Sequence, residues 1–554
     1  MAHRFSILLL FICMLCVSCE REATMEKASL NYVEEQLDKI TPVVLTHDIS
    51  YLPAEEVQVL KLLVKASQYM DDCFLMQVWD GNMDVFRSLK KSSDMKDKKY
   101  LDLFNAMFGP WNRLEEDKPF INTTPKPDGA NFYPADMTKE EFNAWIADHP
   151  DQKETFENTF TMIRRKGDDL VAIPYSEFFK EQLEPAAKLL QEAAELTSDA
   201  TLSTYLKSRA EAFLSNDYYQ SDMDWMDLSG DIEVVIGPYE VYEDNIFEYK
   251  GAFESFVCVV DKEESKRFKE LESYMREMEE HLPIPNEYKN FNRGTSSPIK
   301  IANEIFTAGD TKAGIQTIAF NLPNDERVRE AKGSKKVMLK NVMSAKFEKI
   351  LMPIVDKVIE AQTKRDINFD AYFYHILMHE VSHGLGPGKI TIQGRETTVN
   401  KELQDLYSVI EEAKADVLGM YNAQFMIDKK VAPKSMERSL YATNLGGMFR
   451  SIRFGIDEAH GGGIAIQLNY YLDKAAFKVD ADGNFSVNQR LMKKAIKDLA
   501  KELLIIQAHG DYKAAQKLVE KYRVLRPEVE AALEKCKDVP VDIRPVYPIE
   551  KEIG

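Results

Sequence analysis

Cysteine is scarce in this sequence, and beyond residue 19 no two cysteines have the spacing of a zinc-binding pair. Three of the six lie within the first 19 of 554 residues, and the others, Cys73, Cys258 and Cys536, are far apart. Cysteine zinc sites use closely spaced pairs, and a disulfide framework needs an even number of partners. The sequence therefore argues against both and predicts three buried, inert thiols.

Basic charge is also scarce. Lys and Arg number 71 against 91 Asp and Glu, which gives a formal net charge of −20 and a pI near 5.1. Proteins that bind nucleic acid need a basic surface for its phosphates, so we expect no nucleic-acid partner. Internal repeats, low-complexity tracts and long proline-rich linkers are absent as well. With 44% hydrophobic residues, the chain is expected to be a large globular protein of about two to four folding units.

The N-terminal apolar run is too short for a permanent membrane span. It extends from Phe5 to Val17, follows Arg4, and is succeeded by Ser18 and Cys19. This pattern resembles a bacterial lipoprotein signal, in which residues 1–18 are removed and Cys19 becomes the lipidated first residue. We therefore expect a protein of the cell envelope, anchored outside the cytoplasm through acyl chains, with residues 20–27 as a tether. Ordinary secretion after cleavage nearby is the alternative.

The most informative motif is His-Glu-Val-Ser-His at residues 379–383. A helix turns once per 3.6 residues, so His379 and His383 share one face and can hold one metal ion. Glu380 lies about 100° around the helix, where it can reach water at the metal without being a ligand. An apolar helical face precedes the motif and Gly384 follows it, which predicts a helix that ends here. A pair of ordinary buried histidines is the alternative.

A catalytic zinc needs a third protein ligand, which we expect from a second helical stretch at about 401–426. Glu412 and Asp416 are four residues apart in this stretch, next to a buried apolar side. One of them can bind metal while the other accepts the free N–H of a ligating histidine. We expect Glu412 to be the ligand and Glu411 to be outer-shell or solvated. A solvated acidic helix face is the alternative.

Secondary-structure patterns separate helical from strand-rich regions. Helical patterns dominate residues 54–214 and return from 352 onward, interrupted by a proline-rich loop (109–134), a turn-rich segment (461–463) and a hairpin or loop (480–487). Val-, Ile- and Phe-rich runs predict strands at 232–236, 255–260, 316–320 and 336–339. Polar clusters follow two of these strands, at 237–244 and 321–325, and a third lies at 457–463. Sites are often built in such loops, although turn formation alone also explains them.

In combination, these motifs resemble the dipeptidyl peptidase III family of zinc peptidases. The resemblance covers roughly residues 218–471 and consists of these motifs, in the family's order: Gly237-x-x-Glu240-x-Tyr242, Gly251-Ala-Phe-Glu-Ser-Phe-Val257, Asn321-x-Pro-Asn324, His379-Glu380-x-x-His383 and Glu411-Glu412-x-x-x-Asp416. It implies an α+β fold, predominantly α-helical, with two lobes across a cleft: a helical zinc-binding lobe and a mixed lobe with a small β-barrel-like sheet. We expect the mixed lobe at 19–260 with 305–350, the helical lobe at 261–304 with 351–540, and a C-terminal tail at 541–554.

The resemblance also implies roles for individual residues. Three of them would bind one zinc ion per chain: His379, His383 and Glu412. Glu380 would be the general base, and two acids would lie behind the ligands: Glu411 and Asp416. Three residues would hold the amino group and nearby backbone of a peptide substrate: Glu240, Asn321 and Asn324. Tyr242 and His460 would stabilise the transition state.

The chain departs from the family pattern in two places. The family motif HExxGH has one more residue between its histidines, and Ile464 replaces the family's arginine four residues after His460. The shorter motif resembles a divergent branch that includes plant proteins fused to a Nudix domain, but no Nudix box is present here. We expect a zinc peptidase that cuts short peptides near the amino terminus, with dipeptides as the implied product. A catalytically silent peptide- or metal-binding surface lipoprotein would not need Glu380, and a zinc hydrolase of phosphates or esters would need more Lys or Arg beside the motifs.

Overall fold

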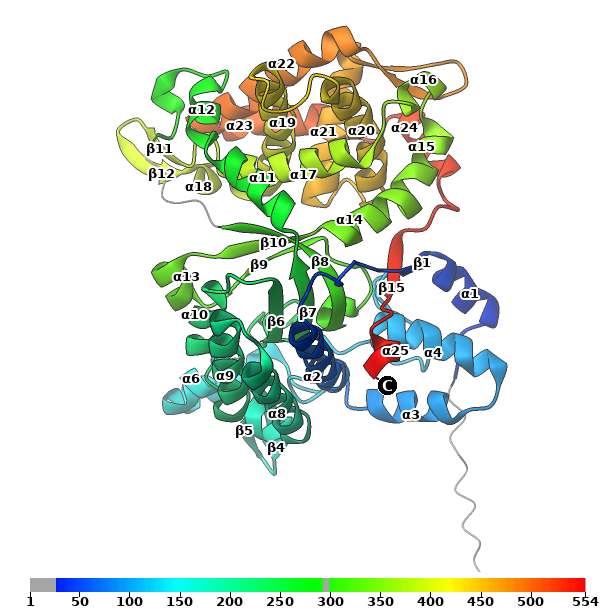
Figure 1. Ribbon diagram of the computed structural model, residues 1–554, viewed down its shortest axis with the longest axis vertical. Helices are drawn as coiled ribbons and strands as arrows, with labels where there is room; N and C mark the ends of the chain where they lie inside the picture. The colour runs from blue at the N-terminus through cyan, green and yellow to red at the C-terminus, as the bar shows by residue number, and fades with distance from the viewer. Residues whose placement is uncertain (1–25, 292–297, 554) are drawn as a thin grey trace, which may run out of the picture.

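The computed structural model describes residues 26–291 and 298–553, which form two lobes stacked along the long axis of the molecule (Figure 1). The upper lobe in this view is mostly helical, whereas the lower lobe combines a five-stranded sheet with helices. This confirms the predicted α+β, predominantly helical fold with two lobes. Cys19 and the predicted signal peptide lie outside the described residues. Within the described part of the chain, we find no helix that is long and apolar enough to span a bilayer.

The sheet of the lower lobe has the strand order β6-β7-β8-β10-β9 and is open, with β6 and β9 at its edges. Its strands are β6 (Ile232–Pro238), β7 (Phe253–Val260), β8 (Ile299–Gly309), β9 (Ala319–Leu322) and β10 (Lys335–Leu339). β10 runs parallel to β8, and the other neighbours are antiparallel. Every residue of β6 and β7 is buried, which explains why these runs lack the polar alternation of a half-exposed strand.

Four of the five strands were predicted, but β8, the longest, was not. Its residues 299–304 belong to the sheet and not to the helical lobe, where we expected them. The reason is that β8 carries polar side chains inside the lobe, where Asn303 and Glu304 are both buried. Burial raises the pKa of Glu304 to about 7, against the effect of a 2.7 Å hydrogen bond from Tyr547. These buried polar groups conceal the strand from a search for apolar runs.

The C-terminal segment returns from the helical lobe to the sheet lobe (Figure 1). Its strand β15 (Asp542–Val546) pairs in parallel with β1 (Ile40–Val44), and the side chain of Tyr547 is buried. Asp542 also forms a buried ion pair with Lys346 at 2.8 Å. Residues 542–547 are therefore an integral part of the fold, although we expected a tail there.

Within residues 26–231, ten α-helices precede the sheet, and α2 among them packs against β7 and β8. The Ser67 hydroxyl of α2 lies 2.7 Å from that of Ser255 on β7. The helices are α1 (Leu30–Asp38), α2 (Ala54–Val78), α3 (Asn82–Lys91), α4 (Met95–Met107), α5 (Lys139–Asp148), α6 (Lys153–Glu157), α7 (Tyr175–Phe178), α8 (Lys180–Leu196), α9 (Ala200–Ser215) and α10 (Tyr219–Met226). Two small hairpins lie among them: β2 (Trp111–Asn112) with β3 (Lys118–Pro119), and β4 (Thr161–Lys166) with β5 (Asp169–Pro174).

At the centre of the helical lobe, α17 (Phe369–His383) packs against α19 (Tyr407–Asp428), and α19 packs against α21 (Ala459–Asp473). The remaining later helices are α11 (Lys262–Glu272), α12 (Met275–His281), α13 (Glu326–Lys332), α14 (Lys340–Lys346), α15 (Met352–Val358), α16 (Ala361–Lys364), α18 (Val399–Leu403), α20 (Met436–Ser451), α22 (Gln489–His509), α23 (Tyr512–Tyr522), α24 (Pro527–Lys535) and α25 (Glu550–Ile553). The hairpins are β11 (Lys389–Ile392) with β12 (Arg395–Thr398), and β13 (Phe477–Val479) with β14 (Phe485–Val487). The last of these confirms the hairpin predicted near 480–487.

The structure confirms the predicted burial of three cysteines. Cys73, Cys258 and Cys536 are free thiols, and all three are buried. Burial raises the pKa of the Cys258 thiol well above its ordinary value, so this sulfur stays protonated and unreactive.

Candidate metal centre and active site

Helix α17 brings the two histidines of the motif together. Asn368 caps its N-terminus by accepting a hydrogen bond from Ala371 N, and the helix ends at His383, directly before Gly384. The two imidazole rings are nearly perpendicular, and their Nε2 atoms lie 3.0 Å apart. The predicted helix, its end and the shared face of His379 and His383 are therefore present in the structure.

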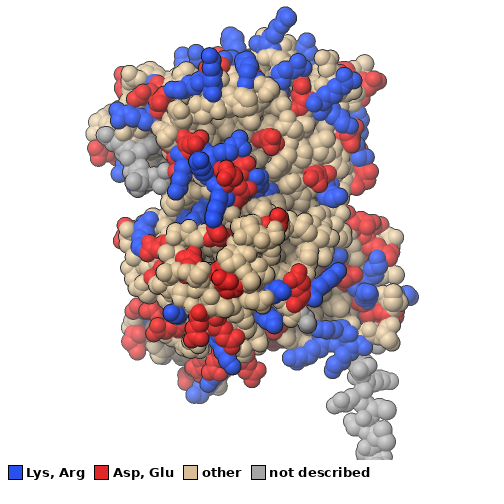
Figure 2. Space-filling view, in the orientation of Figure 1, with Lys and Arg blue, Asp and Glu red and all other residues tan. Residues whose placement is uncertain are grey.

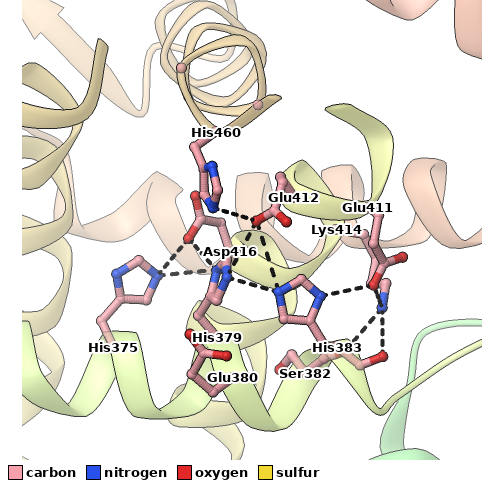
Figure 3. A network of polar contacts seen from close by, with 12 residues as sticks. His375, His379, Glu380, Ser382, His383, Glu411, Glu412, Lys414, Asp416 and His460 are labelled. Carbon is pink, nitrogen blue, oxygen red and sulfur yellow. Dashed lines mark hydrogen bonds and ion pairs between the residues drawn. The ribbon is translucent and has the colours of Figure 1, made fainter. Parts of the chain in front are cut away.

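Helix α19 contributes a carboxylate to the same point. Glu412 Oε2 lies 3.4 Å from His379 Nε2 and 3.9 Å from His383 Nε2 (Figure 3). Two ligand atoms that are each about 2.0–2.1 Å from one tetrahedral zinc ion lie about 3.3–3.4 Å apart. The three atoms therefore have nearly the spacing that a single ion requires, and they are the metal-capable group found among the described residues.

The hydrogen bonding around these atoms also fits a cation. His379 Nδ1 lies 2.7 Å from Asp416 Oδ1, and His383 Nδ1 lies 3.1 Å from Glu411 Oε1. In the neutral form of each ring, with its Nδ1–H donating to the carboxylate, both Nε2 atoms are bare acceptors that face one another. Glu412 Oε2 is buried and has no hydrogen-bond donor in the described structure. Three converging lone pairs without a proton donor are the arrangement that a metal ion would satisfy.

The charges around His379 favour a cation at this position. Burial alone would lower its pKa, but Asp416, together with Glu380 and Glu412, raises it to about 9. Burial would likewise raise the pKa of Asp416, yet His379 holds it well below the usual range. The carboxylate behind the histidine is therefore ionised, which is the state that fixes the ring and strengthens a ligand.

Three polar residues that the sequence analysis missed hold the two outer carboxylates in place. Gln467 Nε2 donates to Asp416 Oδ2 at 3.0 Å, and Gln507 Nε2 donates to Glu411 Oε2 at 2.7 Å. The ammonium group of Lys414 lies 2.7 Å from Glu411 Oε1. Gln467 and Gln507 come from α21 and α22, so no local pattern signals them. Lys414 could have been noticed as a lysine on the buried side of a helix, between two apolar neighbours.

The same lysine closes the end of α17. Its side chain is only 2% exposed, and its ammonium group donates to the carbonyl oxygens of Ser382 and Leu385 at 3.0 and 3.1 Å. Helix C-termini leave carbonyl groups without intrahelical donors, and a cation there is favourable. Lys414 thus connects the end of the histidine helix to Glu411 (Figure 3).

Residues 461–463 form the first turn of α21 and not the turn-rich segment that we expected. A Cβ atom on Gly463 would lie 2.9 Å from the Ala413 backbone nitrogen, and one on Gly461 would lie 1.9 Å from the Gly455 carbonyl oxygen. Gly463 therefore allows α21 to approach α19 closely, and Gly461 leaves room for the preceding loop. Tertiary packing outweighs the low helix propensity of glycine at these positions.

Helix α21 also brings His460 to the metal-capable cluster. His460 Nε2 lies 3.3 Å from Glu412 Oε2, and its Nδ1 lies 2.6 Å from Glu458 Oε1. Burial would lower the pKa of His460, but Glu458 and Glu412 outweigh this effect and raise it. The imidazole is 64% exposed, so it can meet a ligand that enters the cleft.

Glu380 lies beside the histidines and contacts the other lobe. Its Oε2 forms an ion pair with Lys336 of β10. Burial would raise the pKa of Glu380, but Lys336, His379 and His383 lower it, so the carboxylate is ionised. Both residues line a cavity of about 1110 Å³, together with Asn321 of the sheet lobe and His383, Tyr407 and Leu385 of the helical lobe. This cavity therefore has walls from both lobes.

The sheet lobe carries a second polar group near the ends of β6 and β9. Burial raises the pKa of Glu240, against the effect of hydrogen bonds from Asn324 and Tyr242. Asn324 Nδ2 also donates to the Tyr239 carbonyl oxygen at 3.1 Å, and Tyr242 is 74% exposed. Asn321 stands apart from this trio, because it pairs in register with Lys336 and faces the cavity. The predicted site residues thus form two groups, one on each lobe.

A further acid near Glu240 was not predicted as a site residue. Glu254 of β7 is 3% exposed, and burial raises its pKa well above the ordinary value, with added repulsion from Glu240 and Asp310. Its sequence signal was a glutamate inside an otherwise apolar strand. Glu254 therefore adds a second carboxyl group beside Glu240.

The fold and the site together define a metallopeptidase with two lobes and an HExxH helix. More narrowly, the chain belongs to Peptidase family M49, whose family model matches residues 130–435. The solved structure of DPP III from Caldithrix abyssi is 52% identical, with a TM-score of 0.91, over 94% of this chain and 100% of that one. The dipeptidyl-peptidase III of Corallococcus sp. strain EGB is 45% identical, with a TM-score of 0.78, over 95% and 99% of the two chains.

A plant relative completes the comparison. The Arabidopsis thaliana protein named Nudix hydrolase 3 is 38% identical over 587 residues, which cover 96% of this chain and 76% of that protein. These matches confirm the predicted membership of the dipeptidyl peptidase III family. The plant match also agrees with the predicted similarity to a branch that includes plant proteins. The name Nudix hydrolase 3 belongs to the Arabidopsis protein.

Proposed function

We propose that the protein is a zinc-dependent peptidase that hydrolyses short peptides near the amino terminus and releases dipeptides. The observation that carries this proposal is the convergence of His379, His383 and Glu412 beside the ionised carboxylate of Glu380. A site that only stored a metal would not require an ionised base next to its ligands. The cavity between the lobes supplies room for a peptide.

In the proposed reaction the three ligands would hold one zinc ion. When bound, zinc supplies a Lewis acid that polarises the scissile carbonyl and makes water more acidic. Glu380 takes the proton of the attacking water and returns it to the leaving amine. His460 and Tyr242 donate hydrogen bonds to the oxygen on which negative charge develops. Tyr242 lies on the sheet lobe and His460 on the helical lobe, so both can serve only when the substrate lies between the lobes.

The sheet lobe is proposed to bind the free amino terminus. Glu240 is a partly buried carboxylate whose neighbours Asn324 and Tyr242 supply neutral hydrogen-bonding groups. A carboxylate in such surroundings is suited to replace the water around an α-ammonium group. Asn321, at the cavity wall, would hold the peptide backbone between this group and the metal. The distance from the bound amino terminus to the cleaved bond would then be fixed, and this distance sets how many residues are released.

The location proposal rests on the sequence alone. The leader that ends at Ser18-Cys19 supports a lipid-anchored protein of the cell envelope, with secretion as the alternative. Such a protein would meet peptides outside the cytoplasm.

A metal assay combined with a fluorogenic peptide panel tests the proposal. Zinc content would be measured by elemental analysis, and turnover with dipeptidyl, aminoacyl and N-acetyl-dipeptidyl amides that differ only at their amino end. We expect about one zinc per chain and preferential cleavage of the free dipeptidyl amide. Zinc without turnover of any substrate would favour the silent binding protein. Cleavage of phosphate or ester substrates, assayed beside these amides, without cleavage of any amide would favour a zinc hydrolase of a non-peptide substrate.

A further inference from the structure

Glu380 has its ion-pair partner on the opposite lobe. Lys336 lies on β10 of the sheet lobe, whereas Glu380 lies on α17 of the helical lobe, and their side chains meet at the wall of the cavity. The two side chains are 25% and 14% exposed, so water only partly screens the pair. The ion pair therefore crosses the cleft beside the metal-capable cluster. Figure 2 shows the waist between the two lobes, with side chains of both charge signs on the surface near it.

Lys336 is not an element of the sheet lobe's own ion-pair network. Its neighbour Lys335 points to the other face of the strand and pairs inside the lobe with Glu233 at 2.8 Å, where both side chains are buried. The Lys336 ammonium group instead contacts Glu380, and within residues 26–291 and 298–553 no other side chain pairs with either of them. One oxygen of the Glu380 carboxylate, Oε2, is thereby held, while Oε1 carries no protein donor in the same part of the chain.

The geometry points to Lys336 as a positioning residue for the general base: the sheet lobe supplies the ammonium group that fixes the Glu380 carboxylate, so the base is oriented only when the lobes are closed. This inference rests on the peptidase function proposed above. A base must be held within about 0.5 Å of its productive position. A glutamate with one oxygen bound to a cation has fewer rotamers available, and its second oxygen remains free to accept a proton.

The register of the sheet ties this positioning to the substrate. Lys336 of β10 is paired directly with Asn321 of β9, the edge strand that borders the cavity. The residue proposed to hold the peptide backbone and the residue that holds the base are therefore fixed relative to each other by one strand pair. Opening of the lobes would withdraw both from α17 together. Closure on a peptide would restore both, which couples binding to the orientation of the base.

Steady-state kinetics of Lys336 variants test the inference. Lys336→Met keeps the length of the side chain but removes its charge, and we expect kcat to fall by about 10- to 100-fold with KM little changed. Lys336→Arg can still donate to Oε2 and should recover most of the loss. Zinc content should be equal to that of the parent in both variants, because no ligand or ligand partner is altered.

Lys340→Met is the matched control. Lys340 forms an ion pair with Asp261 at 3.0 Å, with side-chain exposures of 26% and 17%, nearly those of the Lys336 pair, but it does not contact Glu380. We expect its kcat to equal that of the parent. An unchanged kcat in Lys336→Met, or an equal fall in Lys340→Met, would overturn the inference. A rise in KM at constant kcat would also overturn the inference. It would show that the ion pair holds the lobes together without positioning the base.

A thermal-unfolding cycle tests the pair without relying on turnover. The Tm would be compared among the parent, Lys336→Met, Glu380→Gln and the double variant. We expect Lys336→Met to lower the Tm less in the Glu380→Gln background than in the parent. Equal shifts in both backgrounds would mean that the pair does not form in solution, which refutes the inference even if the parent proves inactive. A parent that cleaves no peptide, with the cycle still showing coupling, would refute the proposed function instead.

Discussion

Replacing Asp416 by Asn should weaken zinc binding without removing a metal ligand. Asp416 Oδ1 accepts the His379 Nδ1 hydrogen bond at 2.7 Å, and Oδ2 accepts a hydrogen bond from Gln467 at 3.0 Å. An asparagine can keep the first bond if its amide oxygen faces His379. Its NH₂ group would then meet Gln467, whose Oε1 is buried without a donor and could accept it after a flip of the amide. The main change is therefore the loss of one negative charge behind the ligand.

The size of this effect follows from that geometry. Loss of a carboxylate that orients a metal-binding histidine typically weakens metal affinity by about 10- to 100-fold, or about 1.4–2.8 kcal/mol. Asp416 is ionised and its side chain, beside His379, is only 16% exposed, so we expect the upper half of this range. Removal of the neutral Gln467 donor by Gln467→Met should cost less, about 0.5–1.5 kcal/mol.

Competition with a fluorescent chelator would measure the zinc affinity of the parent, Asp416→Asn and Gln467→Met at one pH. The order of affinity should be parent, then Gln467→Met, then Asp416→Asn. Circular dichroism of the three proteins would exclude a loss of fold. Equal zinc affinity for parent and Asp416→Asn would refute the assignment of Asp416 as the partner that orients His379.

The remaining predictions concern proton transfer, pH, substrate and location. Glu380→Gln should retain zinc by elemental analysis and lose most peptidase turnover, because it removes the base and no ligand. In the metal-free folded protein the pKa of His379 is raised from 6.5 to about 9. Protonated His379 therefore stabilises the folded state fully below pH 6.5, and this stabilisation is lost as the pH rises through about 9. Zinc must displace that proton, so the increase in Tm on adding zinc should be larger near pH 9 than near pH 6. Glu240→Gln should shrink the preference for free over N-acetylated peptides, which we expect to be roughly 10- to 100-fold in kcat/KM in the parent; equal cleavage of both by the parent would contradict an exopeptidase. Cys19→Ser should move the protein from the membrane to the soluble fraction or leave it unprocessed, whereas an intact N-terminus in the cytosol would contradict the location.

The parts of the site that the sequence predicted lie within single helices. Helical periodicity places His379 and His383 on one face of their helix. It likewise places Glu412 and Asp416 on one face of a second helix, without knowledge of how the two helices pack. The structure shows that α17 and α19 do bring these faces together. Family resemblance was needed for Glu240 and Tyr242, because their loop has no periodicity that would distinguish a binding group from a turn.

The residues that were missed act over long sequence separations. Gln507 reaches Glu411 from 96 positions away, and Gln467 reaches Asp416 from 51. Residues 461–463 were read as a turn because glycine disfavours helices, yet Gly462 and Gly463 lie where α21 packs closely on α19. Strand β8 was missed because Glu304 is buried within it. In each case tertiary contacts outweigh the local sequence preference on which the prediction was based.

The division of the site between two lobes explains why its two halves differ in predictability. The helical half is built from residues 375–416 and one histidine of α21, so most of it can be read from two helical motifs. The sheet half depends on the register between β9 and β10, which places Asn321 beside Lys336. No motif in the sequence connects Lys336 with Glu380, which are 44 residues apart and on different lobes. The local HExxH motif thus identifies the base, whereas the orientation of the base depends on how the two lobes meet. Variants of Lys336 on the sheet lobe can change this orientation without removing the base.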